Sequence, residues 1–366
     1  MPIKKTEKNI AIASQQELIW WRFKKHKLGF FSGIFLICLY VSTIFTGFFS
    51  VQDPHLPEAF YVQMPPRKIH LFDDGKLSPY IYNIEYERDP KTLRRIFTEN
   101  KDEKIPIRFF VKGFKYKFLG IFSSDIHFIG IDGDSPQVLF LLGADALGRD
   151  LLSRMLYGAQ ISLSIGLLGV FLSLVLGLIL GGISGFFGGI VDTIIQRAIE
   201  IIRSIPTIPL WMGLAAALPR DWSVVKMYFA ITVILSLVGW TGLARMVRGK
   251  ILAVRNEDYV TAAVVCGAKN YRIIFWHILP AFYSHIIAEV TLALPKMIIS
   301  ETSLSFLGLG MRAPAISWGT LLQSAQNLQS LAHAPWLLIP AIPVILTILA
   351  MNFMGDALRD ASDPYS

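Results

Sequence analysis

Three charged residues interrupt an otherwise apolar stretch between residues 286 and 310: Glu289, Lys296 and Glu301. Charged side chains are costly inside a bilayer, so these are candidates for lining a route that carries a solute across it. On a helix, Glu289 and Lys296 lie on nearly one face, two turns or roughly 10 Å apart. That separation is too long for a good direct salt bridge, and Glu301 points elsewhere. Two interpretations stay open: side chains that line a translocation path, and side chains that reach the membrane surface or pair at an interface with another chain.

No motif in the chain indicates catalysis. The nearest approach to a P-loop, Gly242 to Lys250, has the wrong spacing, and Ile251 stands where Ser or Thr is required. Cys38 and Cys266 lie in segments that are not expected to meet, so neither a disulfide nor a metal site is predicted. We therefore expect no enzymatic activity and no cofactor in this chain. If ATP powers its work, another polypeptide hydrolyses it.

The composition excludes an ordinary soluble domain. Of 366 residues, 53% are hydrophobic and 17% are charged, whereas about a quarter are charged in a typical globular chain. The apolar residues occur in long blocks with little charge, and a helix needs about 20 of them to cross the hydrocarbon core. We predict an all-α membrane protein with six transmembrane helices, the third and fifth assigned from context. The predicted spans are 29–51, 155–191, 204–219, 227–244, 286–310 and 335–355.

Lysines and arginines indicate how these spans are oriented. They gather before the first span, between spans two and three, and between spans four and five. The positive-inside rule assigns all three segments to the cytoplasm, and an even number of spans then places both termini there. Because these residues lie at membrane boundaries, the net charge of +8 indicates topology, and no nucleic-acid partner is expected. The segments run from Lys4 to Lys27, from Arg197 to Arg203 and from Arg245 to Arg272.

The first apolar block is predicted to be a retained helix. It is longer than the apolar core of a secretory signal, and no small-residue cleavage site clearly follows it. The resulting layout has a cytoplasmic N-terminal segment, one helix, an extracytoplasmic insertion, a five-helix core and a cytoplasmic tail. These parts are assigned to residues 1–28, 29–51, 52–149, 150–356 and 357–366.

The insertion is predicted to contain short strands. β-branched and aromatic residues form runs at 107–111, 116–122 and 126–131, closed by Asp132-Gly133-Asp134. Its first half instead carries turn signals such as Asp73-Asp74-Gly75. A disordered linker is the alternative, but the aromatic content argues against it.

The cytoplasmic segment 257–280 has a pattern suited to close contact with a partner. Residues 257–268 begin with acidic residues, lack proline and can form a short helix. On it Tyr259 is the one large anchor, and its neighbours three, four and seven residues on are Ala262, Ala263 and Cys266. Small residues allow a partner surface to approach, and Gly267 allows the chain to turn. Pro280 then marks the entry to span five. An ordinary amphipathic connector is the alternative.

Two phrases together resemble the permease subunits of binding-protein-dependent ABC importers, specifically the dipeptide/oligopeptide class. The first runs from Leu142 to Arg154 and contains Gly143-Ala144-Asp145 and Gly148-Arg149-Asp150. The second is similar to the cytoplasmic loop of that superfamily which docks on the ATPase. Its matching residues are Asp258, Tyr259, Ala262, Ala263, Gly267, Ile278 and Pro280. Thr261 departs from the pattern, which usually has Glu there. The phrases Glu301 to Gly310, Gly355 to Asp360 and Asp363-Pro364 also resemble this class.

The resemblance implies a type I ABC importer permease fold in the inner (cytoplasmic) membrane. It also implies a second related permease, two ATPase subunits that bind ATP and Mg²⁺, and an extracytoplasmic solute-binding protein. Alternating access is the mechanism expected of such an assembly. Peptides are the solute it favours, with an oligosaccharide or a metal chelate as the alternative within the same machinery.

Two other classes of function are alternatives. An ion-coupled secondary transporter would have inverted repeats and no ATPase-docking loop. A membrane-anchored sensor would need a cytoplasmic signalling domain, and none is evident in the sequence.

A further pattern concerns helix packing. Glycines recur every four residues at Gly177, Gly181, Gly185 and Gly189, which predicts close helix contact within this subunit or with the second permease.

Overall fold

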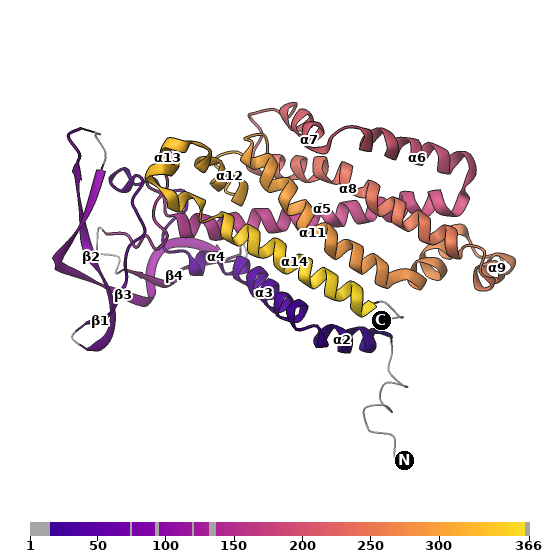
Figure 1. Cartoon of the computed structure of the whole chain (residues 1–366), viewed down its shortest axis with the longest axis horizontal. Helices are drawn as coiled ribbons and strands as arrows, with labels where there is room; N and C mark the ends of the chain where they lie inside the picture. Colours follow the sequence, from indigo (N-terminus) through magenta and orange to yellow (C-terminus); the bar gives the residue numbers. More distant parts are fainter. Residues whose placement is uncertain (1–14, 74, 92–94, 119–120, 132–136, 363–366) are drawn as a thin grey trace, which may run out of the picture. The chain divides into compact units, whose positions relative to one another are not determined.

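The computed structural model describes residues 15–73, 75–91, 95–118, 121–131 and 137–362. Helices dominate it, and one antiparallel sheet is inserted among them, as predicted (Figure 1). The chain divides into two compact units. The first unit comprises Met1–Ile37, Ser164–Leu304 and Ile345–Ser366, and the second comprises Cys38–Leu163 and Ser305–Val344. Some residues on which the predictions rest lie outside the described residues: Lys4, Asp74, Asp132, Gly133, Asp134, Asp363 and Pro364.

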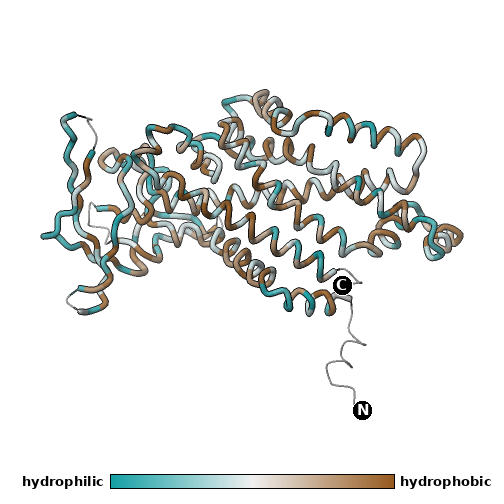
Figure 2. The backbone as a smooth tube through the Cα atoms, in the orientation of Figure 1, coloured by the Kyte–Doolittle hydropathy of each residue, from teal (hydrophilic) through white to brown (hydrophobic). Residues whose placement is uncertain are grey.

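Five helical segments of the described chain are long and apolar enough to cross a membrane. They include the long helices α3, α5, α8, α11 and α14, along which hydrophobic residues predominate (Figure 2). The sequence predicted their existence correctly, although their ends differ by several residues from the apolar blocks. The segments are Lys27–Ile44, Leu151–Phe187, Val224–Val254, Asn270–Phe306 and Pro335–Ser362.

The predicted third span, 204–219, corresponds to only half a crossing. Its helix, α7, covers Thr207–Ala216, about 15 Å of rise where the hydrocarbon core needs about 30 Å. Before it runs α6, Gly189–Ser204, and the two helices meet at an angle of 87°. The break falls at Pro206, because the residue before a proline prefers extended backbone and Ile205 has φ −88° and ψ 131°. The sixth span therefore exists only if this bent pair is counted as one.

Several basic residues that were predicted to lie in cytoplasmic links belong to helices. Arg197 and Arg203 belong to α6. Arg245, Arg248 and Lys250 belong to α8, which continues to Val254, ten residues beyond the predicted end of that span at Ala244. Apolar counting ends a span at its first charges, whereas a helix continues as long as its backbone hydrogen bonds do.

The glycine stripe packs within the subunit. A side chain at Gly181 would place its Cβ 2.5 Å from the carbonyl oxygen of Ala244 on α8, so the α5 and α8 backbones are in close approach. Gly177 and Gly185 face α8 in the same way, against Leu243 and Ile251. Gly189 lies outside the contact, at the start of α6, where a Cβ would meet no heavy atom of the described residues within 4 Å. The prediction of a packing stripe is thus confirmed for three of its four members.

The insertion forms a sheet of order β1-β2-β3-β4, all antiparallel neighbours. The run 116–122, predicted as one strand, is divided by a hairpin: β3 ends at Phe118 and β4 begins at Phe122. Two strands in the first half were not predicted, because their alternating polar residues resemble loop composition. The strands are β1 His70–Asp73, β2 Lys76–Arg88, β3 Arg95–Phe118 and β4 Phe122–Ile131.

Aromatic rings attach the sheet to the end of the first membrane helix. The short helix α4, Thr46–Phe49, follows α3, Lys27–Ile44. Phe48 lies 5.8 Å from Phe128 of β4, and Phe45 lies 5.0 Å from Phe118 of β3, measured between ring centroids. The remaining helical elements are α2 Gln15–Lys25, η1 Ala59–Tyr61, α12 Trp318–Gln323, η4 Ser324–Gln326, α13 Leu328–His333, η5 Pro335–Leu338 and α14 Ala341–Ser362.

Candidate coupling surface and translocation cavity

A short helix follows α8, as the sequence predicted. It is α9, Asp258–Val265, with Glu257 in extended backbone at its N-terminal cap. The chain leaves it through Gly267, whose φ of +78° is in the left-handed region that glycine occupies without strain. The amide nitrogen of Gly267 donates to the carbonyl of Val264 (2.9 Å), and that of Ala268 to the carbonyl of Ala263 (3.1 Å).

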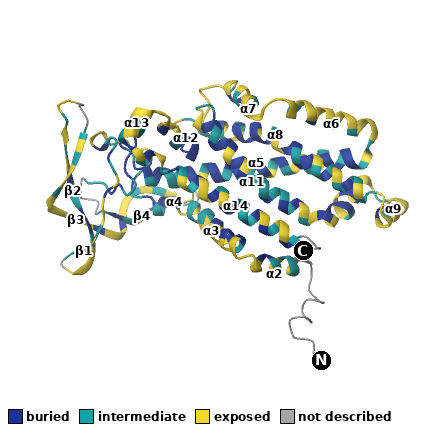
Figure 3. Cartoon of the chain, viewed as in Figure 1, coloured by how far each residue is buried: buried dark blue, intermediate teal, exposed yellow. Residues whose placement is uncertain are grey.

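The two faces of α9 differ in character. Val260 is 1% exposed and packs into a core built from α8 and the helical segment after α9. The exposed part of α9 and its C-terminal cap includes Tyr259, 43% exposed, the small residues Ala262 and Cys266, and Val265, 82% exposed (Figure 3). Ala263 lies between the two faces and contacts that core. The predicted exposure of Tyr259 and its small neighbours is therefore observed, but Tyr259 is not the one large residue of this surface, because Val264 and Val265 are exposed as well.

The segment after α9 is helical well before Pro280. It consists of α10, Asn270–Arg272, a π-helical turn, Ile273–Ile278, and a 3₁₀ turn, Leu279–Phe282, which leads into α11, Tyr283–Phe306. The prediction that Pro280 marks the entry to this span is wrong, because one helical segment extends from Asn270 to Phe306. Proline is accommodated at the first positions of the 3₁₀ turn, where an amide donor is dispensable.

This segment anchors α9 through its buried residues. Ile278 is fully buried in the core that receives Val260, while Pro280 is exposed. Of the residues assigned to the docking loop, Ile278 therefore supports the surface from beneath. Partial burial, followed by the nearby Glu257 carboxylate, raises the pKa of Tyr259 above its ordinary value. Its hydroxyl is thus neutral at physiological pH.

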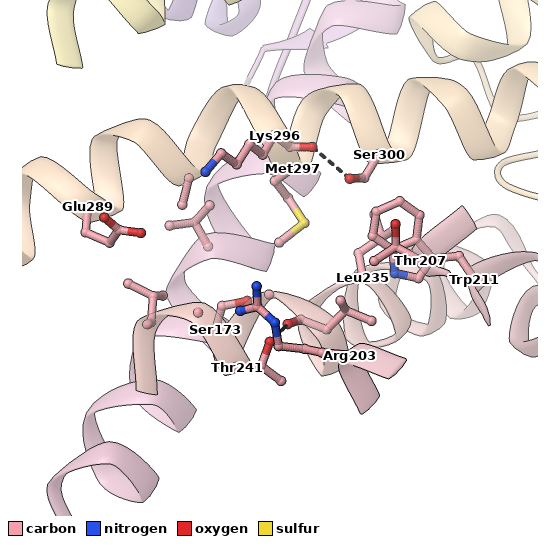
Figure 4. Close-up of a pocket in the computed structure, with 16 residues that line it drawn as sticks. Ser173, Arg203, Thr207, Trp211, Leu235, Thr241, Glu289, Lys296, Met297 and Ser300 are labelled. Atoms are coloured by element: carbon pink, nitrogen blue, oxygen red, sulfur yellow. Dashed lines mark hydrogen bonds between the residues drawn. The ribbon is translucent and has the colours of Figure 1, made fainter. Parts of the chain in front are cut away.

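A cavity of about 360 Å³ lies among α5, α6, α7, α8 and α11 (Figure 4). Glu289 and Lys296 of α11 both line it, so the prediction that they share a face is confirmed. Arg203, from the last turn of α6, is the third charged residue of the lining. Apolar side chains, including Val170, Leu235 and Met297, make up much of the wall.

Glu301 is in a different environment. It lies on α11 but is fully buried and does not line the cavity. Glu301 therefore does not share the cavity-lining face of Glu289 and Lys296, in agreement with the helical geometry. The helix continues through Pro295, which lies between Glu289 and Lys296.

The phrase around residue 145 forms a compact turn in the second unit. The Asp145 carboxylate accepts hydrogen bonds from the amides of Leu147 (2.8 Å) and Arg149 (3.0 Å), and it pairs with the Arg149 guanidinium (2.7 Å). Arg154 lies 3.4 Å from the same carboxylate and donates to the carbonyl of Pro54 (2.9 Å). This motif thus ties the start of α5 to the chain that leaves the first span.

Asp150 caps the N-terminus of α5. Its carboxylate accepts a hydrogen bond from the amide of Ser153 (2.7 Å). The Ser153 hydroxyl in turn accepts from the amides of Val51 (3.0 Å) and Gln52 (3.1 Å). Asp150 is fully buried, and burial raises its pKa to about 6, against the lowering effect of the hydrogen bonds from Ser153.

Comparison with known proteins places these features in a family. Residues 138–365, well over half of the chain, match the family described as binding-protein-dependent transport system inner membrane component. Residues 14–67 match the N-terminal TM domain of oligopeptide transport permease C. The chain belongs to this family of inner-membrane transport components. The two motifs that carry the resemblance, Leu142 to Arg154 and Asp258 to Pro280, both lie in the first matched region of this permease. The resemblance to the dipeptide/oligopeptide class is confirmed.

Individual relatives agree with the assignment. The permease is 40% identical over 223 residues to the oligopeptide transport system permease protein OppC of Bacillus subtilis, covering 61% of this chain and 70% of the relative. It is 39% identical over 231 residues to the dipeptide transport system permease protein DppC of the same organism, covering 63% and 70%. It is 42% identical over 232 residues to the glutathione transport system permease protein GsiD of Salmonella typhimurium, covering 63% and 74%.

Among solved structures, the permease matches the MetNI methionine ABC transporter in an inward-facing conformation. The match is 20% identical, has a TM-score of 0.44, and covers 57% of this chain and 96% of that one. The family models leave residues 68–137 unmatched, and strands β1 to β4 lie there. The sheet therefore lies outside both regions that match the family models.

Sequence reasoning missed Arg203 as a residue of the cavity in this permease. The criterion applied to Glu289, a charge within an apolar run, would have found it, because Ile201 and Ile202 precede Arg203 and Ile205 follows it. Assigning Arg203 to a cytoplasmic link removed it from consideration.

Proposed function

We propose that this permease imports peptides, using ATP hydrolysed by partner subunits. Oligopeptide and dipeptide permeases are among its relatives, with identities near 40%. The family is defined by its dependence on a binding protein. The proposed assembly contains a second permease, two ATPase subunits that hold ATP and Mg²⁺, and an extracytoplasmic solute-binding protein. This chain supplies half of the translocation path and has no catalytic role of its own.

The exposed face of α9 is the observation that carries this proposal. Tyr259, Ala262 and Cys266 form a shallow surface on which a partner can seat closely. The helix is held from beneath by Val260 and by the buried residues of the segment that continues into α11. Because this support is packed and rigid, a displacement of α9 is transmitted to α11 instead of being absorbed in a loop. Movement of the ATPases would then open and close the cavity by alternating access.

The coupling surface has to face the cytoplasm for this mechanism. The basic residues near the N-terminus and around α9 support cytoplasmic placement of both termini and of α9. A cysteine introduced at the exposed Ser78 of β2 should then react with a membrane-impermeant maleimide in intact spheroplasts. Cys266, which is exposed and free, should react only after permeabilisation.

Ala262→Trp tests the coupling surface. Ala262 is exposed, so the larger ring leaves the core of this chain intact and obstructs only a partner. We expect a membrane-inserted permease that copurifies poorly with its ATPases in mild detergent and transports no peptide. Val225→Trp is the control, because Val225 is also exposed but lies at the end of α8 far from α9, so this variant should be silent. Normal copurification and peptide uptake in Ala262→Trp would contradict the coupling role.

A further inference from the structure

The charged side chains of the cavity have no partners among the described residues. The side chains of Arg203, Glu289 and Lys296 form no ion pair or hydrogen bond with any other residue in the part of the chain that the structure describes. In Figure 4 the Arg203 guanidinium extends into the cavity from one side, and the Lys296 amine from the α11 side. An unpaired charge at membrane depth is costly, so such groups persist where they meet water, another chain or a ligand.

The remaining wall is suited to an organic ligand that carries charges. Trp211 lines the cavity, and its indole nitrogen is buried without a hydrogen-bond acceptor among the described residues. The hydroxyls of Thr241 and Ser300, by contrast, already donate to backbone carbonyls of their own helices, at 2.7 Å each. Apolar surroundings strengthen the electrostatic attraction between the lining charges and a ligand.

The backbone positions of the two oppositely charged residues on α11 are also spaced about as far apart as the ends of a short peptide. Glu289 and Lys296 are seven residues apart on α11, roughly 10 Å of helical rise. A fully extended peptide of three residues spans about the same length. The volume of about 360 Å³ is within the range of small-ligand sites and excludes a folded substrate.

We propose that this cavity binds a short peptide in its zwitterionic form during transfer. Lys296 and Arg203 bind the α-carboxylate, and Glu289 binds the α-ammonium. The inference rests on the proposed peptide uptake and adds a selective site within the permease itself. A net charge of +1 in the lining also favours the carboxylate end over a cation, which a purely cation-conducting path would not do.

The test uses the complete complex in proteoliposomes, with its partner subunits and binding protein, and radiolabelled trialanine as the probe. Lys296→Gln and Arg203→Gln should each lower trialanine uptake about tenfold, equivalent to about 1.4 kcal/mol. Assembly and the ATPase activity stimulated by the binding protein should be unchanged. Lys296→Arg retains the charge and should restore uptake. Lys226→Gln, an exposed lysine of α8 outside the cavity, is the matched control.

End-modified peptides separate ligand binding from a structural role. The preference for trialanine over its N-acetyl form should fall in Glu289→Gln, and the preference over its C-terminal amide should fall in Lys296→Gln. The binding protein is the same in every assay, so a change in preference belongs to the permease. Unchanged uptake and preferences in these variants would overturn the proposal, as would loss of assembly, which would assign the charges to the second permease. Absence of peptide uptake by the unmodified complex would instead refute the proposed function itself.

Discussion

Arg248 of α8 donates two hydrogen bonds to the carboxylate of Asp192 of α6, from Nε at 2.6 Å and from Nη2 at 2.5 Å. Ser184 of α5 donates a third to the same carboxylate at 2.5 Å. The pair joins residues 56 positions apart and fixes α6 against α8. Because Arg203 lies in the last turn of α6, this contact also helps to set where the guanidinium of the cavity is held.

Removing one side of this pair should destabilise the permease. Both side chains are largely shielded from solvent, so Arg248→Ala leaves a carboxylate with fewer donors, at a cost of about 2–3 kcal/mol. Asp192→Asn keeps an acceptor oxygen and should cost less. In a double-mutant cycle the two effects should be less than additive. Thermal unfolding of the purified protein in detergent measures all three variants, and additive effects would show that the pair contributes nothing as a pair.

Two adjacent glycines of α5 should respond oppositely to alanine. A Cβ at Gly181 would lie 2.5 Å from the Ala244 carbonyl oxygen, so Gly181→Ala forces α5 and α8 apart, at a cost of about 1–3 kcal/mol. A Cβ at Gly182 would lie 3.4 Å from a methyl group of Ile274, an ordinary contact. Gly182→Ala should therefore be neutral, or stabilising by up to about 1 kcal/mol through helix propensity. Equal unfolding temperatures for the two variants would contradict the close approach.

Asp150 should make stability depend on pH in an unusual direction. Burial raises its folded-state pKa from 3.8 to about 6, so the folded protein binds the proton more tightly than the unfolded chain does. The contribution of this group is fully present below pH 3.8 and is lost as pH rises through 6. Above pH 6 the buried carboxylate costs on the order of 3 kcal/mol relative to its protonated form.

Asp150→Asn isolates this effect. The amide oxygen can still accept from Ser153, so the cap is kept while the charge is removed. The variant should unfold at a higher temperature than the unmodified protein at pH 8, and the difference should vanish near pH 4. A variant less stable at pH 8 would mean that the ionised form has a partner outside this chain.

The sequence predicted well those features that depend on local pattern. Apolar blocks predicted the long helices, because a bilayer demands length and hydrophobicity from each one. The pattern from Glu257 to Gly267 predicted α9 and its turn, since an acidic start and a glycine end are local signals. The shared face of Glu289 and Lys296 likewise followed from helical geometry alone.

Features that depend on distant contacts could not be read in the same way. The Asp192–Arg248 pair joins two helices whose packing no local pattern specifies. The strand β2 was missed because its polar residues face solvent while Ile81 and Ile84 are buried, an alternation interrupted by a bulge between Tyr82 and Asn83. Arg203 was misplaced because the 87° bend after α6 is set by Pro206, and hydropathy averages across it.

Gly267 allows the shape of the coupling turn to be separated from contact with a partner. Its φ of +78° is costly for residues with a Cβ, by roughly 1–2 kcal/mol, although asparagine tolerates it better than most. Among the described residues, no heavy atom beyond its chain neighbours lies within 4 Å of a Cβ at this position, so a substitution meets no obstacle from them. If only the turn matters, Gly267→Asn should support nearly normal uptake, and Gly267→Ala and Gly267→Val should be progressively worse.

If the ATPase seats closely on this turn, as we propose, Gly267→Asn and Gly267→Asp should also lose copurification with the ATPases while the permease still inserts and folds. Asn256→Ala, exposed and just outside α9, is the control and should behave normally. Copurification and uptake close to normal in Gly267→Asp would show that this turn is free in the assembly and would remove it from the coupling surface.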